Sequence, residues 1–123
     1  MSTRCLWIFE APTDEWAETF RNALPSCPRI FFFARLGGKR FAIGMYTEDK
    51  ASMDAEIRCF EQVAGISGIW TEECTELFVP ADWKMEVQET GREETLCGVL
   101  PCDECPTCDD CLGCPGTIWY LST

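Results

Sequence analysis

The 123-residue chain contains no histidine and few basic side chains: ten Lys and Arg stand against 21 Asp and Glu, giving a formal net charge of −11. Without histidine the chain has no Cys/His nucleophile pair, and any metal must be bound by thiolates or by oxygen ligands. Direct binding to nucleic acid is not expected, because phosphate backbones are bound by clustered Lys and Arg. The acidic charge favours solubility and docking to a protein partner with a basic surface.

Targeting and membrane segments are also missing from the sequence. Residues 1–9 carry one positive charge and a short apolar run without a small-residue cleavage site, which is not the pattern of a signal peptide. No apolar run is long enough to span a membrane, and there is no phosphate loop or dinucleotide fingerprint. Ten cysteines without an export signal predict a cytoplasmic protein whose thiolates are metal ligands or redox groups. No sequence pattern assigns an enzymatic activity to the chain on its own.

The hydrophobic fraction of 46%, with eight Phe and five Trp, is ample for a folded core. We expect an α+β domain at residues 1–80, a polar bridge at 81–96 and a Cys-rich metal-binding tail at 97–123. The end of the tail, residues 116–121, is apolar and rich in β-formers, so we expect it to dock on the domain as a short strand or plug.

The periodicity of the first 80 residues predicts strand, helix, strand, strand, helix, strand. The strands are expected at residues 5–9, 29–35 and 41–46, with a last one made of 69–71 and 77–79 interrupted by acidic residues. Thr13 can cap the first helix, which Pro25 ends, and the second helix opens at residues 47–51 and stops at 65–68. This order predicts a ferredoxin-like βαββαβ fold, an antiparallel sheet with both helices on one face.

Three details of this domain carry expectations of their own. The strand at 5–9 is apolar throughout, which suits a central strand buried on both faces. Gly44 weakens its strand and indicates a bulge or the close approach of a ligand. Cys59 lies beside the apolar positions of the second helix and is read as a small buried side chain, whereas Cys27 is read as a spare thiol rather than a remote ligand.

The densest pattern in the sequence is a cysteine run near the C-terminus. It consists of Cys97, Cys102, Cys105, Cys108, Cys111 and Cys114. The last five are each separated by two residues, and a C-x-x-C loop turns tightly enough to bring both sulfurs to one ion or cluster. Pro101, Pro106 and Pro115 exclude a regular helix, so the run is expected to be an irregular loop that wraps a metal.

The spacing favours an iron–sulfur cluster of the 4Fe–4S type. Its expected ligands are Cys102, Cys105, Cys108 and either Cys111 or Cys114. The ending Cys114-Pro115 is typical of ferredoxin runs, although the last gap in the bacterial motif is three residues rather than two. Zinc is the alternative, bound by Cys102, Cys105, Cys111 and Cys114, and it would leave Cys97 and Cys108 without a role.

Two other readings of the run remain. Cys97, Cys102 and Cys105 match the beginning of the plant-type ferredoxin spacing, which would need a distant fourth ligand. Disulfides within the run would close small, strained loops that add little stability. A thiol oxidoreductase is conceivable because neighbouring thiols exchange, but no activating cation is evident beside the run.

Four short stretches carry a family resemblance: GKRFAIGM (38–45), TEDK (47–50), ISGI (66–69) and TEECTELF (71–78). They look like the effector-binding, RAM-like half of Lrp/AsnC-type regulators, and with the first strand and helix the similarity covers about two thirds of the chain. The resemblance implies the same ferredoxin-like fold, a homodimer formed by pairing sheets, and a small molecule, often an amino acid, between subunits. No helix-turn-helix precedes Cys5 and Ser67 replaces a usual proline, so regulation of transcription does not carry over.

From these patterns we expect a small iron–sulfur or metal-thiolate protein that acts as an electron-transfer or accessory subunit of a larger assembly. The alternative is an Lrp/AsnC-like small-molecule-binding module whose cysteine loop binds zinc or senses metal or redox state.

Overall fold

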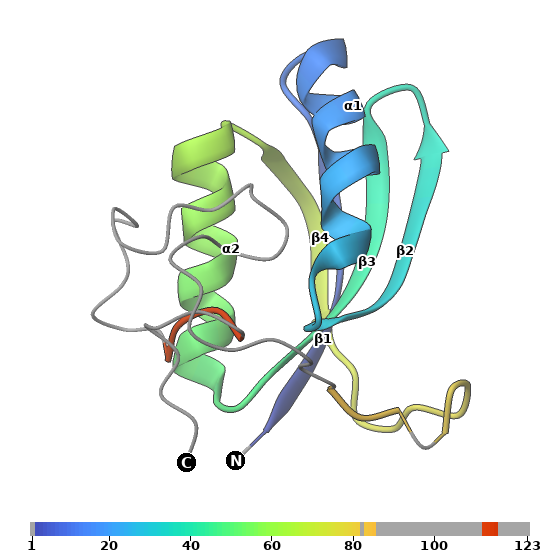
Figure 1. Cartoon of the computed structure of the whole chain (residues 1–123), viewed down its shortest axis with the longest axis vertical. Coiled ribbons are helices and arrows are strands. Elements are labelled where there is room, and N and C mark those ends of the chain that lie inside the picture. The colour runs from blue at the N-terminus through green and yellow to red at the C-terminus, as the bar shows by residue number, and fades with distance from the viewer. Residues whose placement is uncertain (1, 82, 86–111, 116–123) are drawn as a thin grey trace.

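Two helices pack against one face of a four-stranded antiparallel sheet with the strand order β2-β3-β1-β4 (Figure 1). In this computed structural model, the residues that the structure describes are 2–81, 83–85 and 112–115. The elements are β1 (Thr3–Glu10), α1 (Asp14–Ala23), the 3-10 helix η1 (Leu24–Ser26), β2 (Ile30–Gly37), β3 (Arg40–Thr47), α2 (Lys50–Ala64) and β4 (Ser67–Glu73). The predicted α+β class is confirmed, and the order of elements and strands is compatible with a ferredoxin-like arrangement.

Strand β1 lies at the centre of the sheet, paired with β3 on one side and β4 on the other. Its side chains alternate: Cys5, Trp7 and Phe9 are buried toward the helices, whereas Leu6 and Ile8 on the opposite face are only half-buried. The prediction of burial on both faces is therefore wrong. The physical reason is that α1 and α2 both lie on one side, so within the described part of the chain no helix covers the other face.

Both helices begin at a side-chain cap, and α2 ends at a glycine. The Thr13 side chain accepts a hydrogen bond from the Trp16 backbone N–H at 3.1 Å, which caps α1 as predicted. Asp49 caps α2 in the same way, accepting from the Ser52 N–H at 2.8 Å. Gly65 ends α2 with a φ of 67°, a left-handed conformation that glycine adopts without strain. The first helix contributes Phe20 to the core.

Aromatic rings fill the space between sheet and helices. Phe9 of β1 stacks on Phe41 of β3, and Phe20 of α1 meets both of them edge-on. Phe60 of α2 contacts Trp7 and Phe20, so each helix is packed on the same cluster. Aromatic pairs of this geometry add stability beyond the area that they bury.

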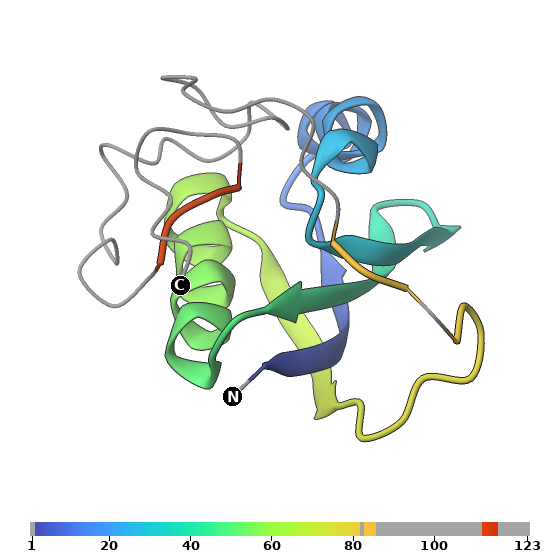
Figure 2. The same cartoon turned by 60° about the horizontal axis from the view of Figure 1, so that its bottom comes forward.

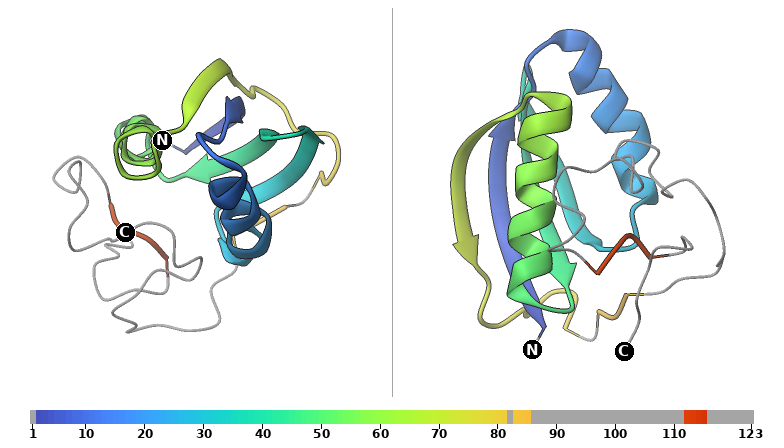
Figure 3. Two further views of the ribbon diagram at one scale, coloured as in Figure 1. Left: turned by 90° about the horizontal axis from the view of Figure 1, so that it is seen from above. Right: turned by 90° about the vertical axis from the view of Figure 1, so that its left-hand side faces the viewer.

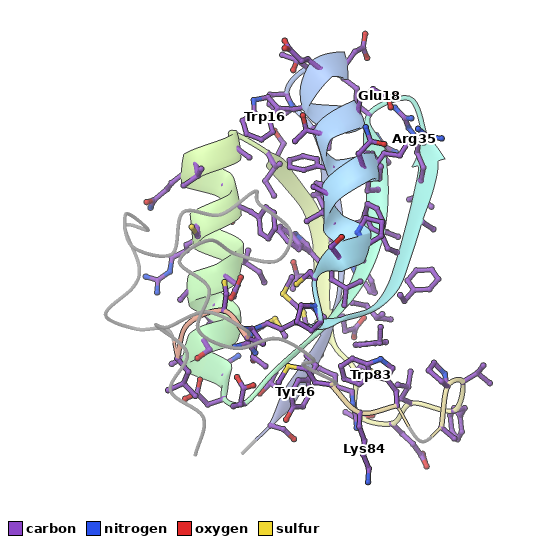
Figure 4. The ribbon with its side chains drawn as sticks, in the orientation of Figure 1. Trp16, Glu18, Arg35, Tyr46, Trp83 and Lys84 are labelled. Atoms are coloured by element: carbon purple, nitrogen blue, oxygen red, sulfur yellow. The ribbon has the colours of Figure 1, made fainter. Side chains whose placement is uncertain are left out.

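The β2–β3 hairpin has an irregular register opposite Gly44, where Phe31 is the extra residue of β2. A Cβ on Gly44 would lie 2.7 Å from the Phe31 ring, so a side chain of the protein itself packs closely against this glycine, and the predicted approach of a ligand stays a prediction. Trp83 contacts the rings of Phe31 and Tyr46, each at a centroid distance of 5.6 Å (Figure 4). Residues 83–85 thus return to the end of the sheet.

The last strand differs from its prediction. β4 runs unbroken from Ser67 to Glu73, and residues 77–79 form no strand. The acidic residues continue the ladder because they pair with β1, with Glu73 opposite Cys5, and the edge position leaves their side chains in solvent. Residues 77–79 lie past the end of β1, and Phe78 and Val79 are exposed.

In the part of the chain that the structure describes, no helix is long and apolar enough to cross a bilayer. The strand or plug predicted for residues 116–121 and most of the polar bridge lie outside the described residues.

Candidate functional site at the anchor of the cysteine run

Residues 112–115, which include the last cysteine of the run, lie against the α+β domain. Residues 112–115 lie beside the N-terminal half of α2, as Figures 2 and 3 show. Gly113 and Pro115 are buried there, and Cys114 is half-buried. Five of the predicted ligands lie outside the described residues, so their predicted roles stay predictions: Cys97, Cys102, Cys105, Cys108 and Cys111.

Arg29, which directly precedes β2, holds this segment through its guanidinium. Its side chain is only 1% exposed, and Nη2 donates a hydrogen bond to the Gly113 carbonyl oxygen at 2.6 Å. Nη1 donates to Glu48 Oε1 at 2.7 Å and, at 3.4 Å, to the Tyr46 carbonyl. The planar fork of donors lets one side chain bind the β3 end, the loop before α2 and the tail together.

Two carboxylates compensate the buried charge of Arg29. Glu48 lies in the loop before α2, and Glu56, on α2, approaches Arg29 Nε at 3.6 Å with a side chain only 6% exposed. Burial on its own lowers the pKa of the guanidinium, but Glu56 and Glu48 outweigh that effect and raise the pKa of Arg29 above its ordinary value. A buried arginine without such partners would be strongly destabilising.

Ser52, in the first turn of α2, makes the second contact with the tail. Its Oγ accepts a hydrogen bond from the Leu112 backbone N–H at 3.0 Å. The Ser52 side chain and backbone also hydrogen-bond the carboxyl of Asp49, the N-cap, and these bonds lower the pKa of Asp49. The helix cap and the tail therefore share one buried serine.

Cys114 is the only predicted metal ligand of the run among the described residues. Its thiol donates a long hydrogen bond to Glu56 Oε1, with 4.0 Å between sulfur and oxygen. The segment has no regular secondary structure, and Cys114 is half-buried in it. Across the described ranges, no group of three or more Cys, Asp and Glu side chains is arranged to hold a metal ion.

The other described cysteines differ in their surroundings. Cys5 and Cys59 are buried in the core, which confirms the reading of Cys59 as a small buried side chain. Burial raises the pKa of the Cys5 thiol, because a thiolate is poorly solvated there. Cys27 and Cys74 are half-buried outside the run.

Sequence reasoning missed the four polar residues that build this anchor: Arg29, Glu48, Ser52 and Glu56. One pattern could have indicated Glu56, because it falls three residues after Met53 and four before Phe60, on the buried stripe of α2. A charge at such a position implies a buried partner. Arg29, between Pro28 and an apolar strand, has no comparable pattern.

Fold and site together define a small α+β domain with one end of a cysteine run fixed on its surface through a buried ion-pair cluster. Comparison of the chain with models of protein families, with curated proteins and with solved structures found no match. The resemblance to Lrp/AsnC-type domains and the iron–sulfur cluster therefore stay predictions.

Proposed function

We propose that the chain is a metal-thiolate protein in which the α+β domain, of ferredoxin-like type, carries a metal centre in its cysteine run. The spacing of the cysteines favours an iron–sulfur cluster as this centre, and zinc is the alternative. When bound, a cluster would supply one-electron transfer, and the protein would serve as an electron-transfer or accessory subunit of a larger assembly.

The observation that carries this proposal is the fixed position of the last cysteine of the run, Cys114. Residues 112–115 are bound through Arg29 and Ser52, so Cys114 is held beside α2 as a half-buried residue. A ligand whose backbone is already ordered loses less entropy when a metal arrives. The acidic surface, with a formal charge of −11, supports docking to a basic partner.

Anaerobic purification with analysis of iron and acid-labile sulfide tests the centre. A brown protein that contains iron and sulfide in stoichiometric amounts is the expected result. A colourless protein with stoichiometric zinc would rule out the iron–sulfur cluster and support the zinc alternative. Protein that takes up neither metal would refute the proposal. Cys114→Ser should lower the metal content or its retention, whereas Cys74→Ser, outside the run, is the matched control and should not.

A second candidate, an Lrp/AsnC-like module that binds a small molecule, is favoured by the open face of the sheet. Within the described residues both helices lie on the other face, and the side chains of Phe32 and Trp70 are 48% and 44% exposed. Phe32 pairs with Gly44, and Trp70 pairs with Ile8, which places both aromatic side chains on this open face. In the family that the sequence resembles, such faces pair into homodimers.

Light scattering over a range of protein concentrations tests this second candidate. A dimer that Trp70→Glu dissociates, together with a thermal shift by members of an amino-acid panel, would support it. A monomer with no response to the panel would rule it out and leave the metal proposal untouched.

A further inference from the structure

The contact between Arg29 and Gly113 acts on the backbone that begins Cys114. The Gly113 carbonyl and the Cys114 N–H belong to one planar peptide unit. When Arg29 Nη2 binds the Gly113 oxygen at 2.6 Å, it therefore fixes the plane from which Cys114 starts. The position of the cysteine sulfur then depends on two torsions of Cys114 itself, its backbone φ and its side-chain rotation.

The bond from the Leu112 N–H to Ser52 Oγ fixes the chain on the other side. It holds the peptide unit that enters Leu112, at 3.0 Å. Only the backbone angles of residues 112 and 113 lie between the two held peptide units, so this short piece is restrained at both ends. Arg29 itself is restrained by Glu48 and Glu56, which makes it a rigid support rather than a mobile surface cation.

We propose that Arg29 is a positioning residue for Cys114, which orders the last thiol of the run before any metal binds. This rests on the proposed function in one respect, namely that Cys114 is a ligand of the metal centre. The role needs a guanidinium: a lysine keeps the positive charge between the two carboxylates but lacks the fork that binds Glu48 and Gly113 at the same time.

Alkylation of the metal-free, reduced full chain tests the positioning directly. Wild-type protein and the variants Arg29→Lys and Ser52→Ala are treated with iodoacetamide, and mass spectrometry follows each cysteine over time. Cys114 should react roughly tenfold faster in Arg29→Lys, the opening expected when a hydrogen bond to a charged group is lost. In Ser52→Ala, which leaves the charge cluster intact, it should react about two- to tenfold faster.

Three other cysteines separate positioning from general loss of structure. Cys5 and Cys59 are buried in the core and should stay as slow in both variants as in wild type. Cys74, directly after β4, should be alkylated at its wild-type rate in both variants. If Cys5 and Cys59 accelerate together with Cys114 in both variants, Arg29 supports the fold alone and the proposal is overturned. An unchanged Cys114 rate in both variants would overturn it equally.

A metal arm links the positioning to the centre. After loading with Zn²⁺ alone, removal of the ion by a chelator should be several-fold faster from Arg29→Lys than from wild type. In a Cys114→Ser background the same change at Arg29 should have no effect, because its action passes through Cys114. An equal effect in both backgrounds would refute the positioning of a ligand. If the wild-type chain binds neither zinc nor iron, the proposed function fails, whereas the alkylation rates still decide whether Arg29 positions Cys114.

Discussion

Replacing Arg29 by methionine should cost the domain more stability than any change to a surface ion pair. Methionine keeps much of the apolar stem but removes the guanidinium, and with it the bonds to Glu48 at 2.7 Å and to Gly113 at 2.6 Å. Two carboxylates, of which Glu56 is only 6% exposed, then lose their ion pair with Arg29. Removing one partner of a buried ion pair costs about 3–5 kcal/mol. We expect a loss of that size in the free energy of unfolding.

The matched control is Arg35→Met. Arg35 also pairs with a glutamate, Glu18, at 3.3 Å, but the two side chains are 36% and 54% exposed (Figure 4). Exposed pairs of this kind contribute about 0–1 kcal/mol. Urea unfolding of the metal-free protein, followed by circular dichroism, measures both variants, since small domains commonly have about 5–15 kcal/mol of stability to lose.

A double-mutant cycle separates the ion pair from simple loss of packing. Arg29→Met combined with Glu56→Gln also removes one of the two carboxylate charges that face Arg29, so the double variant should be less destabilised than the sum of the two single changes. If Arg29→Met costs no more than Arg35→Met, or if the double change is strictly additive, the cluster is not the buried electrostatic support described above.

Three further outcomes follow from backbone and cap geometry. Gly44→Ala should cost about 1–3 kcal/mol in urea unfolding, because its Cβ would meet the Phe31 ring at 2.7 Å, and Phe31→Leu in the same chain should recover part of the loss. The pKa of Asp49 is lowered in the folded state, so its carboxylate stabilises α2 fully at pH values above its unfolded pKa of about 3.9. This stabilisation is lost as the pH falls through the lower pKa of the folded state. Asp49→Ala should remove that pH dependence from the melting temperature. Gly65→Ala, at a φ of 67°, should lower stability by about 1 kcal/mol although Pro12 leaves room for the methyl group at 3.7 Å, and an unchanged melting temperature would contradict the left-handed cap.

Local patterns were enough to predict most of the domain. The cap at Thr13 and the stop at Gly65 each depend on residues near in sequence, and the structure has both. The last strand was misread because a run of glutamates resembles a loop. At the edge of a sheet those side chains remain in solvent, so their charge does not oppose strand pairing.

The anchor of the tail could not be read in the same way. Arg29 reaches its partners at Glu48 and Gly113, which lie 19 and 84 residues further along the chain. Nothing near Arg29 in sequence shows that its charge will be compensated, and an arginine next to a strand is ordinarily exposed. The spacing of the cysteines is enough to indicate a metal site. The place where that site meets the domain depends on contacts between residues far apart in the sequence.

This pairing joins two parts of the chain that the sequence presents as independent. Because Arg29 is buried in the presence of the tail, undocking residues 112–115 would take away the Gly113 carbonyl, an acceptor on which that burial depends. By linkage, a ligand that binds the docked tail more tightly than the undocked tail must stabilise the contacts of the tail with the start of β2 and with the first turns of α2. Metal bound through Cys114 would then raise the unfolding midpoint of wild-type protein more than that of Arg29→Lys. Equal increases in the two proteins would show that the metal centre and the domain are thermodynamically separate.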